Sequence, residues 1–459
     1  MNIFRMTVAQ HHRLHDHLFD GSGLEAIAVG LCGRGSSPGR ELLTVHEIVE
    51  IPHEECQRLT DSIQWPTRRL RDLLARAKAE GLAVFKIHSH PGGYRQFSAL
   101  DDASDQELFS AVGFKVAGEH LSAVMLPDGE IFGRRMDGSA ERAVIDRVSV
   151  IGDEVRIWPI IEAAMGAKDF DVRHRQAFGD RTINLLSTLT IAIVGISGTG
   201  SPTAEMLARL GVGRLILIDP DMVEAKNLNR IWGARRAHVK AKLNKARMMK
   251  AHIEAMGLGT IVEILDDRID TPEGIAMLST CDFAFGCVDS VEGRDALNRI
   301  ATFYTLPYID MGVRLDADGS GGVSSISAGV HYLQPGGSSL KSRGVYSDAE
   351  LYAEYLKRTD PDFYQDQVRR GYIHGVSVDR PAVISINTAV AAAAVNEMLA
   401  RLHPFRTAPN GNFALQKLLF THGRIALRPD GPADTELANF VGRGDSSPLL
   451  MSPRMERAA

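Results

Sequence analysis

Apolar and polar positions divide the chain into two blocks in which strands and helices alternate. In the first block, short apolar runs predict strands, and leucines at helical spacing ahead of Gly81 predict a helix that ends there. The turn Pro127-Asp128-Gly129 between two short apolar runs predicts a hairpin. The expected elements are strands at 24–31, 42–51 and 82–87, helices at 68–79 and 101–114, and a hairpin at 121–126 and 131–135.

The second block begins near Arg173 and repeats a strand–helix–strand rhythm, which favours a parallel α/β sheet. We expect strands at 189–194, 214–218, 260–265 and 282–286, and helices at 202–210, 240–256 and 381–399. The resulting domain organisation is an α/β domain at 1–140, a linker at 141–172, a second α/β domain at 173–427 with a variable insertion at 335–380, and a polar tail at 428–459.

Composition narrows the function classes. The chain has 459 residues, 44% of them hydrophobic, and a net charge of −5, which excludes a globally basic nucleic-acid binder. Its four cysteines form no C-x-x-C pair, so no disulfide framework is expected. No apolar run reaches the ~20 residues that a bilayer span needs, and the N-terminus lacks a signal-peptide core. We expect a soluble cytoplasmic protein with an exposed histidine-rich N-terminal segment.

The first candidate site is His88-Ser89-His90-Pro91, directly after a predicted strand. Histidines at i and i+2 of an extended chain point the same way, so both can reach one metal ion. Asp101, from the following helix, can supply a third ligand. Three protein ligands leave one position for water, as in catalytic zinc sites, and zinc lowers the pKa of that water towards ~7.

Hydrolysis at such a site also needs a proton carrier and an oxyanion stabiliser. Glu25, on the first predicted strand, is the candidate general base, and Ser98 is the candidate oxyanion stabiliser. Three other glutamates remain alternatives for the base: Glu41, Glu47 and Glu50.

The spacing H-x-H, seven residues, S, two residues, D resembles the signature of the JAB/JAMM metalloproteases. The resemblance implies a cytidine-deaminase-like α/β domain that binds Zn²⁺ through His88, His90 and Asp101. It also implies removal of ubiquitin-like proteins from conjugates, or trimming of their C-terminal tails.

The second candidate site is a glycine-rich turn between a predicted strand and helix, with Gly195, Gly198 and Gly200. Such a turn lets backbone N–H groups approach a phosphate at the helix N-terminus. Asp219, at the end of the next strand, is placed to bind ribose hydroxyls. A glycine motif alone fits any dinucleotide fold.

Three further residues favour ATP over NAD. Arg230 and Lys245 supply cations for a triphosphate, and Asp289 can hold Mg²⁺ near the α-phosphate. An NAD enzyme has no comparable need for two cations after the ribose-binding acid.

Together these residues resemble the ThiF-type adenylating fold, a Rossmann-like domain shared with ubiquitin-activating enzymes. The resemblance implies nucleotide-binding roles for several further residues, and the chain departs from the family pattern at Ser197, where glycine is usual. Residues implied by the resemblance are Asp219 and Asp221 of the D-x-D element, Asn227 and Arg230 of N-L-x-R, the catalytic Lys245, the Mg²⁺-binding Asp289 and the N-terminal Arg175, which can reach nucleotide across a dimer.

The two resemblances imply one combined function. A peptidase that trims a ubiquitin-like precursor exposes a carboxylate that the second domain can adenylate with ATP. The whole chain resembles components of bacterial ubiquitin-like conjugation systems, some of which are tied to phage defence. This resemblance implies a ubiquitin-like protein and a conjugating-type enzyme as partners. It also implies a homodimer that forms through the adenylating domain. The alternatives are a sulfur-carrier system and a scaffold with both sites silent.

The positions of the cysteines predict whether this chain forms a thioester. Thioester-forming activating enzymes carry a cysteine after the Mg²⁺ aspartate, but this chain has none past Cys287. Residues 335–344 resemble a zinc-binding element with serine at the cysteine positions, and serine is a poor zinc ligand. We therefore expect no second zinc and no thioester, with direct transfer of the adenylate favoured over an oxyester on Ser339, Ser342 or Ser377.

Overall fold

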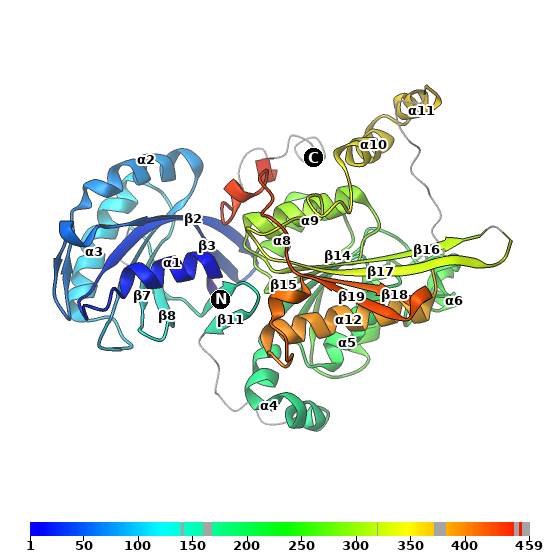
Figure 1. The fold of residues 1–459 in the computed structure, drawn as a ribbon, viewed down its shortest axis with the longest axis horizontal. Coiled ribbons are helices and arrows are strands. Elements are labelled where there is room, and N and C mark those ends of the chain that lie inside the picture. Colours follow the sequence, from blue (N-terminus) through cyan, green and yellow to red (C-terminus); the bar gives the residue numbers. More distant parts are fainter. Residues whose placement is uncertain (139–141, 159–167, 319, 371–381, 445–448, 452–459) are drawn as a thin grey trace.

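Figure 1 shows the chain as a computed structural model with two α/β domains. The structure describes all residues except 139–141, 159–167, 319, 371–381, 445–448 and 452–459. A nine-stranded sheet forms the centre of the N-terminal domain, and an eight-stranded sheet forms the centre of the C-terminal domain. Within the described residues, no helix is long and apolar enough to cross a membrane.

The first sheet has the strand order β11-β10-β1-β3-β2-β6-β7-β8-β9. Strands β1, β3, β6 and β10 run in one direction, because β1 is parallel to β3 and β10, while β2 is antiparallel to both β3 and β6. The strand bounds are β1 (Asn2–Thr7), β2 (Ile27–Ser37), β3 (Arg40–Glu50), β6 (Ala83–Ser89), β7 (His120–Met125), β8 (Ile131–Met136), β9 (Arg142–Val144), β10 (Arg147–Ile151) and β11 (Val155–Trp158).

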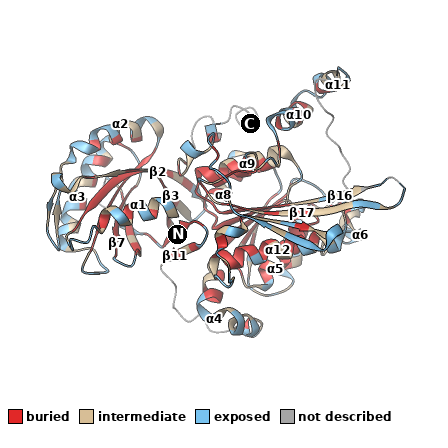
Figure 2. Cartoon of the chain, viewed as in Figure 1, coloured by how far each residue is buried: buried red, intermediate tan, exposed pale blue. Residues whose placement is uncertain are grey.

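Three helices cover this sheet, α1 (Val8–Leu18) on one face and α2 (Leu70–Glu80) with α3 (Ala99–Lys115) on the other. Figure 2 shows the strands buried and the outer sides of α2 and α3 exposed. Two short strands, β4 (Gln57–Arg58) and β5 (Ile63–Gln64), form a separate ribbon.

Two expectations for this half of the chain are corrected. Residues 142–158 do not belong to a linker, since β9, β10 and β11 are strands of the first sheet. The N-terminal segment is exposed only in part, because β1 lies between β10 and β3 and His11 of α1 is buried, while His12 is exposed. The His11 ring contacts the Gly129 carbonyl at 2.7 Å, and burial lowers its pKa to about 4. A neutral imidazole is compatible with a core position.

The second sheet has the order β14-β13-β12-β15-β16-β17-β18-β19, parallel from β14 to β16 and antiparallel from β16 to β19. This parallel order with crossover helices is the Rossmann-like arrangement expected from the sequence. The strand bounds are β12 (Thr190–Val194), β13 (Arg214–Ile218), β14 (Ile261–Leu265), β15 (Phe283–Gly286), β16 (Tyr308–Ala317), β17 (Val323–Leu333), β18 (Leu415–Leu419) and β19 (Arg424–Arg428).

Helices pack on both faces of the second sheet, with α4, α5, α7 and α12 in one core and α8 and α9 in the other. The expected helix over 240–256 is two helices, α6 and α7, and the insertion carries α10 and α11. The helix bounds are α4 (Val172–Leu186), α5 (Gly200–Arg209), α6 (Arg236–Lys240), α7 (Lys245–Glu254), α8 (Pro272–Ser279), α9 (Val291–Phe303), α10 (Asp348–Thr359), α11 (Pro361–Arg369) and α12 (Ile384–Leu402).

The two domains share their hydrophobic cores. Ile3 and Leu42 of the first sheet belong to the cluster around α8 and α9. Ile151, Val155 and Ile157 belong to the cluster around α5 and α12. Because apolar side chains of one domain complete the cores of the other, the domains pack as one body.

Buried charges cross the same interface. Asp282, which precedes β15, accepts a hydrogen bond from Arg147 Nη1 at 2.6 Å and lies 3.4 Å from Arg40 Nη2. Arg5 of β1 donates to the backbone carbonyls of Cys281 at 2.6 Å and Tyr304 at 3.0 Å. Burial raises the pKa of Asp282, but the neighbouring arginines outweigh it, and the pKa is lowered overall.

We expect Asp282→Asn to destabilise the chain by about 3–5 kcal/mol, because it leaves buried arginines without their counter-charge. Urea unfolding followed by circular dichroism measures this loss, with Glu254→Gln, at an exposed position at the end of α7, as control. Since the pKa of Asp282 is lower in the folded chain, its contribution is present above the ordinary aspartate pKa of about 3.9 and is lost as the pH falls through the folded pKa. A variant as stable as wild type at pH 7 would contradict this account of the interface.

The C-terminal tail closes the interface. Residues 441–444, the interdomain strap, hydrogen-bond to both domains: Gly33 N donates to Gly442 O at 3.0 Å, and Gly442 N donates to Thr302 O at 3.1 Å. Gly442 has φ +68°, and a Cβ atom there would lie 1.9 Å from the Val45 carbonyl oxygen, so only glycine fits. This part of the expected polar tail is therefore packed.

Candidate functional site

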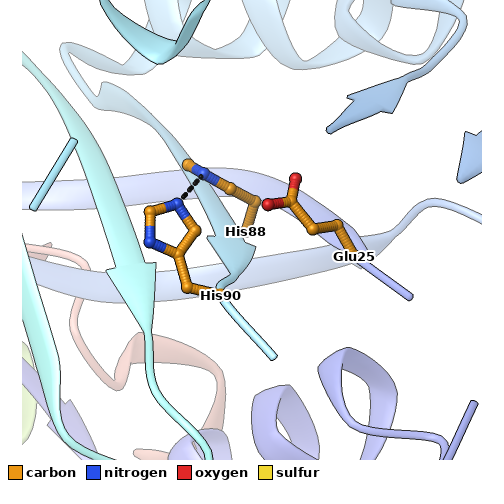
Figure 3. A group of neighbouring side chains, drawn as sticks. All are labelled: Glu25, His88 and His90. Carbon is orange, nitrogen blue, oxygen red and sulfur yellow. Dashed lines mark hydrogen bonds between the residues drawn. The ribbon is translucent and has the colours of Figure 1, made fainter. Parts of the chain in front are cut away.

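The first group of candidate residues lies at the carboxyl end of β6 (Figure 3). His88 is the penultimate residue of β6, and its Nε2 lies 3.1 Å from Nε2 of His90. Glu25, in the loop before β2, points towards them, and one atom from each of the three residues lies within 4.8 Å of the other two. All three side chains are buried.

Asp101 joins this group from the first turn of α3. Its Oδ1 lies 2.9 Å from His88 Nε2, and its Oδ2 lies 3.5 Å from His90 Nε2. Ser98 is the N-cap of α3, and its hydroxyl donates to Asp101 Oδ2 at 2.7 Å. Ser98 therefore orients the aspartate in this structure.

The donor set fits zinc. Two ligand nitrogens at the usual zinc distance of about 2.0–2.1 Å stand roughly 3.3 Å apart in a tetrahedral site, close to the 3.1 Å between the two Nε2 atoms. His90 Nδ1 donates to the Tyr94 carbonyl at 2.8 Å, which leaves its Nε2 lone pair free to bind a metal. Burial lowers the pKa of His88 to about 4, so this imidazole is neutral. Burial also lowers the pKa of His90, but its contacts with Asp101 and the Tyr94 carbonyl outweigh burial, and the pKa is raised overall.

Glu25 lies just before a strand, and not on the first strand as expected. Its N–H donates to Leu59 O at 2.8 Å, and Arg58 Nε donates to its carbonyl at 2.7 Å, so the β4 segment fixes its backbone. Burial raises the pKa of its carboxyl to about 7, which suits a general base. The alternatives contact other residues: Glu41 pairs with Ser36, Glu47 with Arg76, and Glu50 with Arg13.

The second group surrounds a cavity of about 1110 Å³ at the carboxyl ends of β12, β13 and β15. Gly195 begins the turn after β12 with φ +91°, and a Cβ on Gly200 would lie 1.8 Å from the Gly195 carbonyl oxygen. A Cβ on Gly198 would lie 2.2 Å from Asn387 Nδ2. Ser197, which stands where the family usually has glycine, lines the cavity, so its side chain has space there.

Asp219 holds the glycine turn to the strand beside it. Its Oδ2 accepts from Ile196 N at 2.7 Å, and its Oδ1 accepts from Asp221 N at 2.9 Å. Lys245, at the start of α7, donates to Asp221 Oδ2 at 2.7 Å and lies 3.6 Å from Asp219 Oδ1. Each carboxylate oxygen keeps a lone pair for a further donor such as a ribose hydroxyl.

The remaining predicted residues divide into two sets. Asn227, Arg230 and Asp289 line the same cavity as Lys245. Arg175 does not line it, because its guanidinium pairs with Asp171 at 2.9 Å within α4. In this single chain Arg175 is therefore not brought to the candidate nucleotide site.

Asn387 and Arg294 are two of the cavity residues that the sequence did not predict. Asn387 comes from α12, almost 190 positions beyond the glycine turn, and no local pattern marks it. Arg294, buried beside Asp310, follows Asp289 by five positions in α9, and that spacing is the available signal.

Burial raises the pKa of two cysteine thiols, and hydrogen bonds hold the two described candidate serines of the loop, of which Ser342 is exposed. Burial raises the pKa of Cys281 to about 12, and it also raises the pKa of Cys287, which lines the cavity. Ser339 is buried and donates to Asp434 Oδ2 at 2.5 Å, while Ser342 Oγ accepts from Ser339 N at 2.9 Å. Ser377 lies outside the described residues.

Two families match the chain. The ThiF family matches residues 172–426, and the prokaryotic homologs of the JAB domain match residues 7–132. The cavity lies in the first match, and Glu25, His88, His90 and Asp101 lie in the second. The expectation of a JAB–ThiF arrangement is confirmed.

Curated relatives include the ubiquitin-like modifier-activating enzyme 5 of Drosophila persimilis, 31% identical over 156 residues, and that of Xenopus laevis, 31% identical over 161 residues. These segments are 32% and 33% of this chain and 38% of each relative, so the chain spans well under half of their length. Among solved structures, E. coli MccB with ATP is 17% identical, with 61% of this chain and 75% of that chain covered at a TM-score of 0.44.

Proposed function

This chain belongs to the ThiF family, with a JAB domain fused ahead of the ThiF domain, and we propose on this basis that it both processes and activates a ubiquitin-like protein. The C-terminal domain adenylates the C-terminal carboxylate of that protein with ATP. The N-terminal domain is a zinc-dependent peptidase that exposes this carboxylate or releases the protein from conjugates.

The observation that carries the proposal is the charge arrangement around the cavity. Lys245 and Arg230 face the same space as Asp219 and Asp289, in a cavity of about 1110 Å³. Cations beside a glycine turn suit a polyphosphate, and the two carboxylates suit a ribose and a divalent cation. The cavity also exceeds the ~300–1,000 Å³ of an ordinary ligand pocket, which leaves room for a peptide tail beside the nucleotide.

Adenylation follows from these positions. A carboxylate oxygen of the tail attacks the α-phosphorus of ATP, a C–O–P bond forms, and the bond to pyrophosphate breaks. Lys245 and Arg230 balance the negative charge that develops on the phosphate oxygens. Asp289 would hold Mg²⁺, which when bound neutralises phosphate charge.

Peptide hydrolysis needs the first group of residues. His88, His90 and Asp101 would hold Zn²⁺, which when bound polarises a carbonyl and acidifies water. Glu25 accepts the proton of the attacking water and delivers it to the leaving amine. Ser98 supports the site by orienting Asp101, and its single hydroxyl proton would have to leave Asp101 before it could be donated to the oxyanion of the tetrahedral intermediate.

We expect Glu25→Gln to lower peptidase turnover by roughly 10²–10⁴-fold while the zinc content stays unchanged, because glutamine cannot accept the proton. Cleavage of a ubiquitin-like precursor and metal analysis of the same preparation measure the two effects. Glu41→Gln, which removes a charge elsewhere in the domain, should behave as wild type. Full cleavage by the Glu25 variant would assign the base to another residue.

Exchange of labelled pyrophosphate into ATP tests the adenylation half. Exchange should require a ubiquitin-like protein with a free C-terminal glycine, and it should be absent with the same protein extended past that glycine. Exchange with no dependence on such a protein, or reduction of NAD, would contradict the proposal.

The raised thiol pKa values of Cys281 and Cys287 support direct transfer of the adenylate to a conjugating-type enzyme, without a thioester on either cysteine. A raised thiol pKa keeps Cys281 and Cys287 protonated at neutral pH, and a thiol is a far weaker nucleophile than a thiolate. We also propose a homodimer through the ThiF domain, in which Arg175 would face the partner's nucleotide.

A further inference from the structure

A buried ionic cluster lies one layer behind the metal-binding group. Lys86, Asp105 and Arg134 are all buried, and they come from β6, α3 and β8. Asp105 Oδ1 pairs with Lys86 Nζ, and Asp105 Oδ2 accepts from Arg134 Nη2 at 2.6 Å. None of the three belongs to the proposed zinc ligands or the proposed base.

Helix α3 contacts strand β6 at two places: Asp101 meets the two histidines, and Asp105 meets Lys86. Lys86 precedes His88 by two residues, so both side chains leave the same face of β6. Asp105 follows Asp101 by four residues, so both lie on the same face of α3. The step from Lys86 to His88 along the strand is about 6.6 Å, and the step from Asp105 to Asp101 along the helix is about 6 Å. Because these two steps are nearly equal, both pairs of residues can meet at the same time.

Asp105 is the main anchor of the first half of α3. Within Ala99 to Glu107 it is the one buried side chain, whereas the apolar anchors Phe109 and Val112 lie further along. Figure 2 shows this helix largely exposed. The turn that carries Asp101 thus depends on a charged contact and not on apolar packing.

Arg134 extends the same contact to the loop before α3. Its guanidinium lies 3.7 Å from the centre of the Phe97 ring, and Phe97 immediately precedes the N-cap Ser98. The Phe97 ring packs edge-on against Phe132, which also contacts the His90 ring. One cluster therefore fixes both the loop and the first turn.

From this geometry we propose that Asp105, held by Lys86 and Arg134, is a positioning residue that fixes Asp101 as the third metal ligand. The proposal rests on the zinc site of the proposed function. Without Asp105 the first turns of α3 lose their anchor, and the Asp101 carboxylate is no longer held against His88 and His90.

The test measures Zn²⁺ affinity of the full chain by competition with a fluorescent chelator. Asp105→Asn keeps the shape but removes the charge that holds both cations, and we expect its zinc affinity to fall by about 10–100-fold, the usual range for residues behind a metal ligand. Glu107→Gln removes the same charge from the exposed side of α3 and should bind zinc like wild type. Pyrophosphate exchange by the C-terminal domain should be equal in all variants.

A second variant tests whether Asp105 acts by anchoring α3 to the sheet or by its negative charge alone. Lys86→Met combined with Asp105→Leu replaces the ionic contact by an apolar one, and Arg134 keeps Asp102 as a partner. This double variant should recover most of the zinc affinity lost in Asp105→Asn. If it folds and binds zinc as weakly as Asp105→Asn, the anchoring role is overturned.

The outcomes also separate this proposal from the proposed function. Wild-type chain that binds no zinc would overturn the metal site itself. Wild-type chain that binds zinc, with an Asp105→Asn variant that binds it equally well, would overturn the positioning role and leave the metal site intact.

Discussion

Replacing His88 and His90 together by alanine is expected to remove zinc and to lower peptidase turnover by more than about a thousandfold. The reason is that these two imidazoles supply two of the three converging donor atoms, with Nε2 atoms 3.1 Å apart. Loss of a single oxyanion donor already costs about 10²–10³ in turnover, and loss of the metal removes both carbonyl polarisation and water activation.

Metal analysis after dialysis and cleavage of a ubiquitin-like precursor measure the two effects. A matched double variant, His12→Ala with His422→Ala, removes two exposed histidines and should keep zinc and activity. The ThiF domain of the double His88/His90 variant should still exchange pyrophosphate, because its cavity contains no residue of the first domain. Equal zinc in the two double variants would contradict the metal site.

Lys245→Ala and Asp289→Ala are each expected to lower pyrophosphate exchange by about 10²–10³-fold. Lys245 is buried beside two carboxylates, and its loss removes a cation fixed in place before the nucleotide binds. Asp289→Ala removes the carboxylate proposed to hold Mg²⁺. Arg230→Ala should weaken the same step.

Lys250→Ala is the matched control for this experiment, because Lys250 lies on the same helix and outside the cavity lining. Peptidase activity should remain unchanged in every one of these variants. Exchange that persists in Asp289→Ala would exclude this residue from the reaction.

Local sequence patterns predict most of what brings the candidate residues together. The i, i+2 spacing of His88 and His90 predicts one shared direction, and their Nε2 atoms are indeed in contact. A strand followed by a glycine turn predicts the edge of the sheet at which Asp219 and Lys245 meet. The first of these predictions depends on one strand, and the second depends on the parallel order of neighbouring strands.

What the sequence does not predict depends on pairing between distant segments. Strand β10 lies beside β1, although about 145 residues separate their partners Ile3 and Arg147. A short run such as residues 147–151 is too brief and too mixed to distinguish a central strand from a connection. Asp282 and Asp105 are charged residues, which the sequence places by default on the surface. Both are buried, because tertiary contacts pair them with arginine or lysine side chains.

The direction of the strands decides where the two proposed reaction sites lie relative to the domain interface. Strands β2 and β3 contact the ThiF domain at the end of β2 and the start of β3, whereas His88 pairs with Ile27 at the opposite end of β2. Asp282 contacts the first domain at the start of β15, whereas the nucleotide cavity lies beyond its other end. Each candidate site therefore lies at the end of its strand that is away from these contacts, and the two domains share hydrophobic cores and the interdomain strap. Figure 1 shows the two domains side by side. If both proposed activities are present, we expect a trimmed partner to dissociate from the first site and to be captured again at the second, by this copy or another. Flux through the pair then follows the concentration of free partner, and two copies that are each defective in a different centre should complement one another in a mixture.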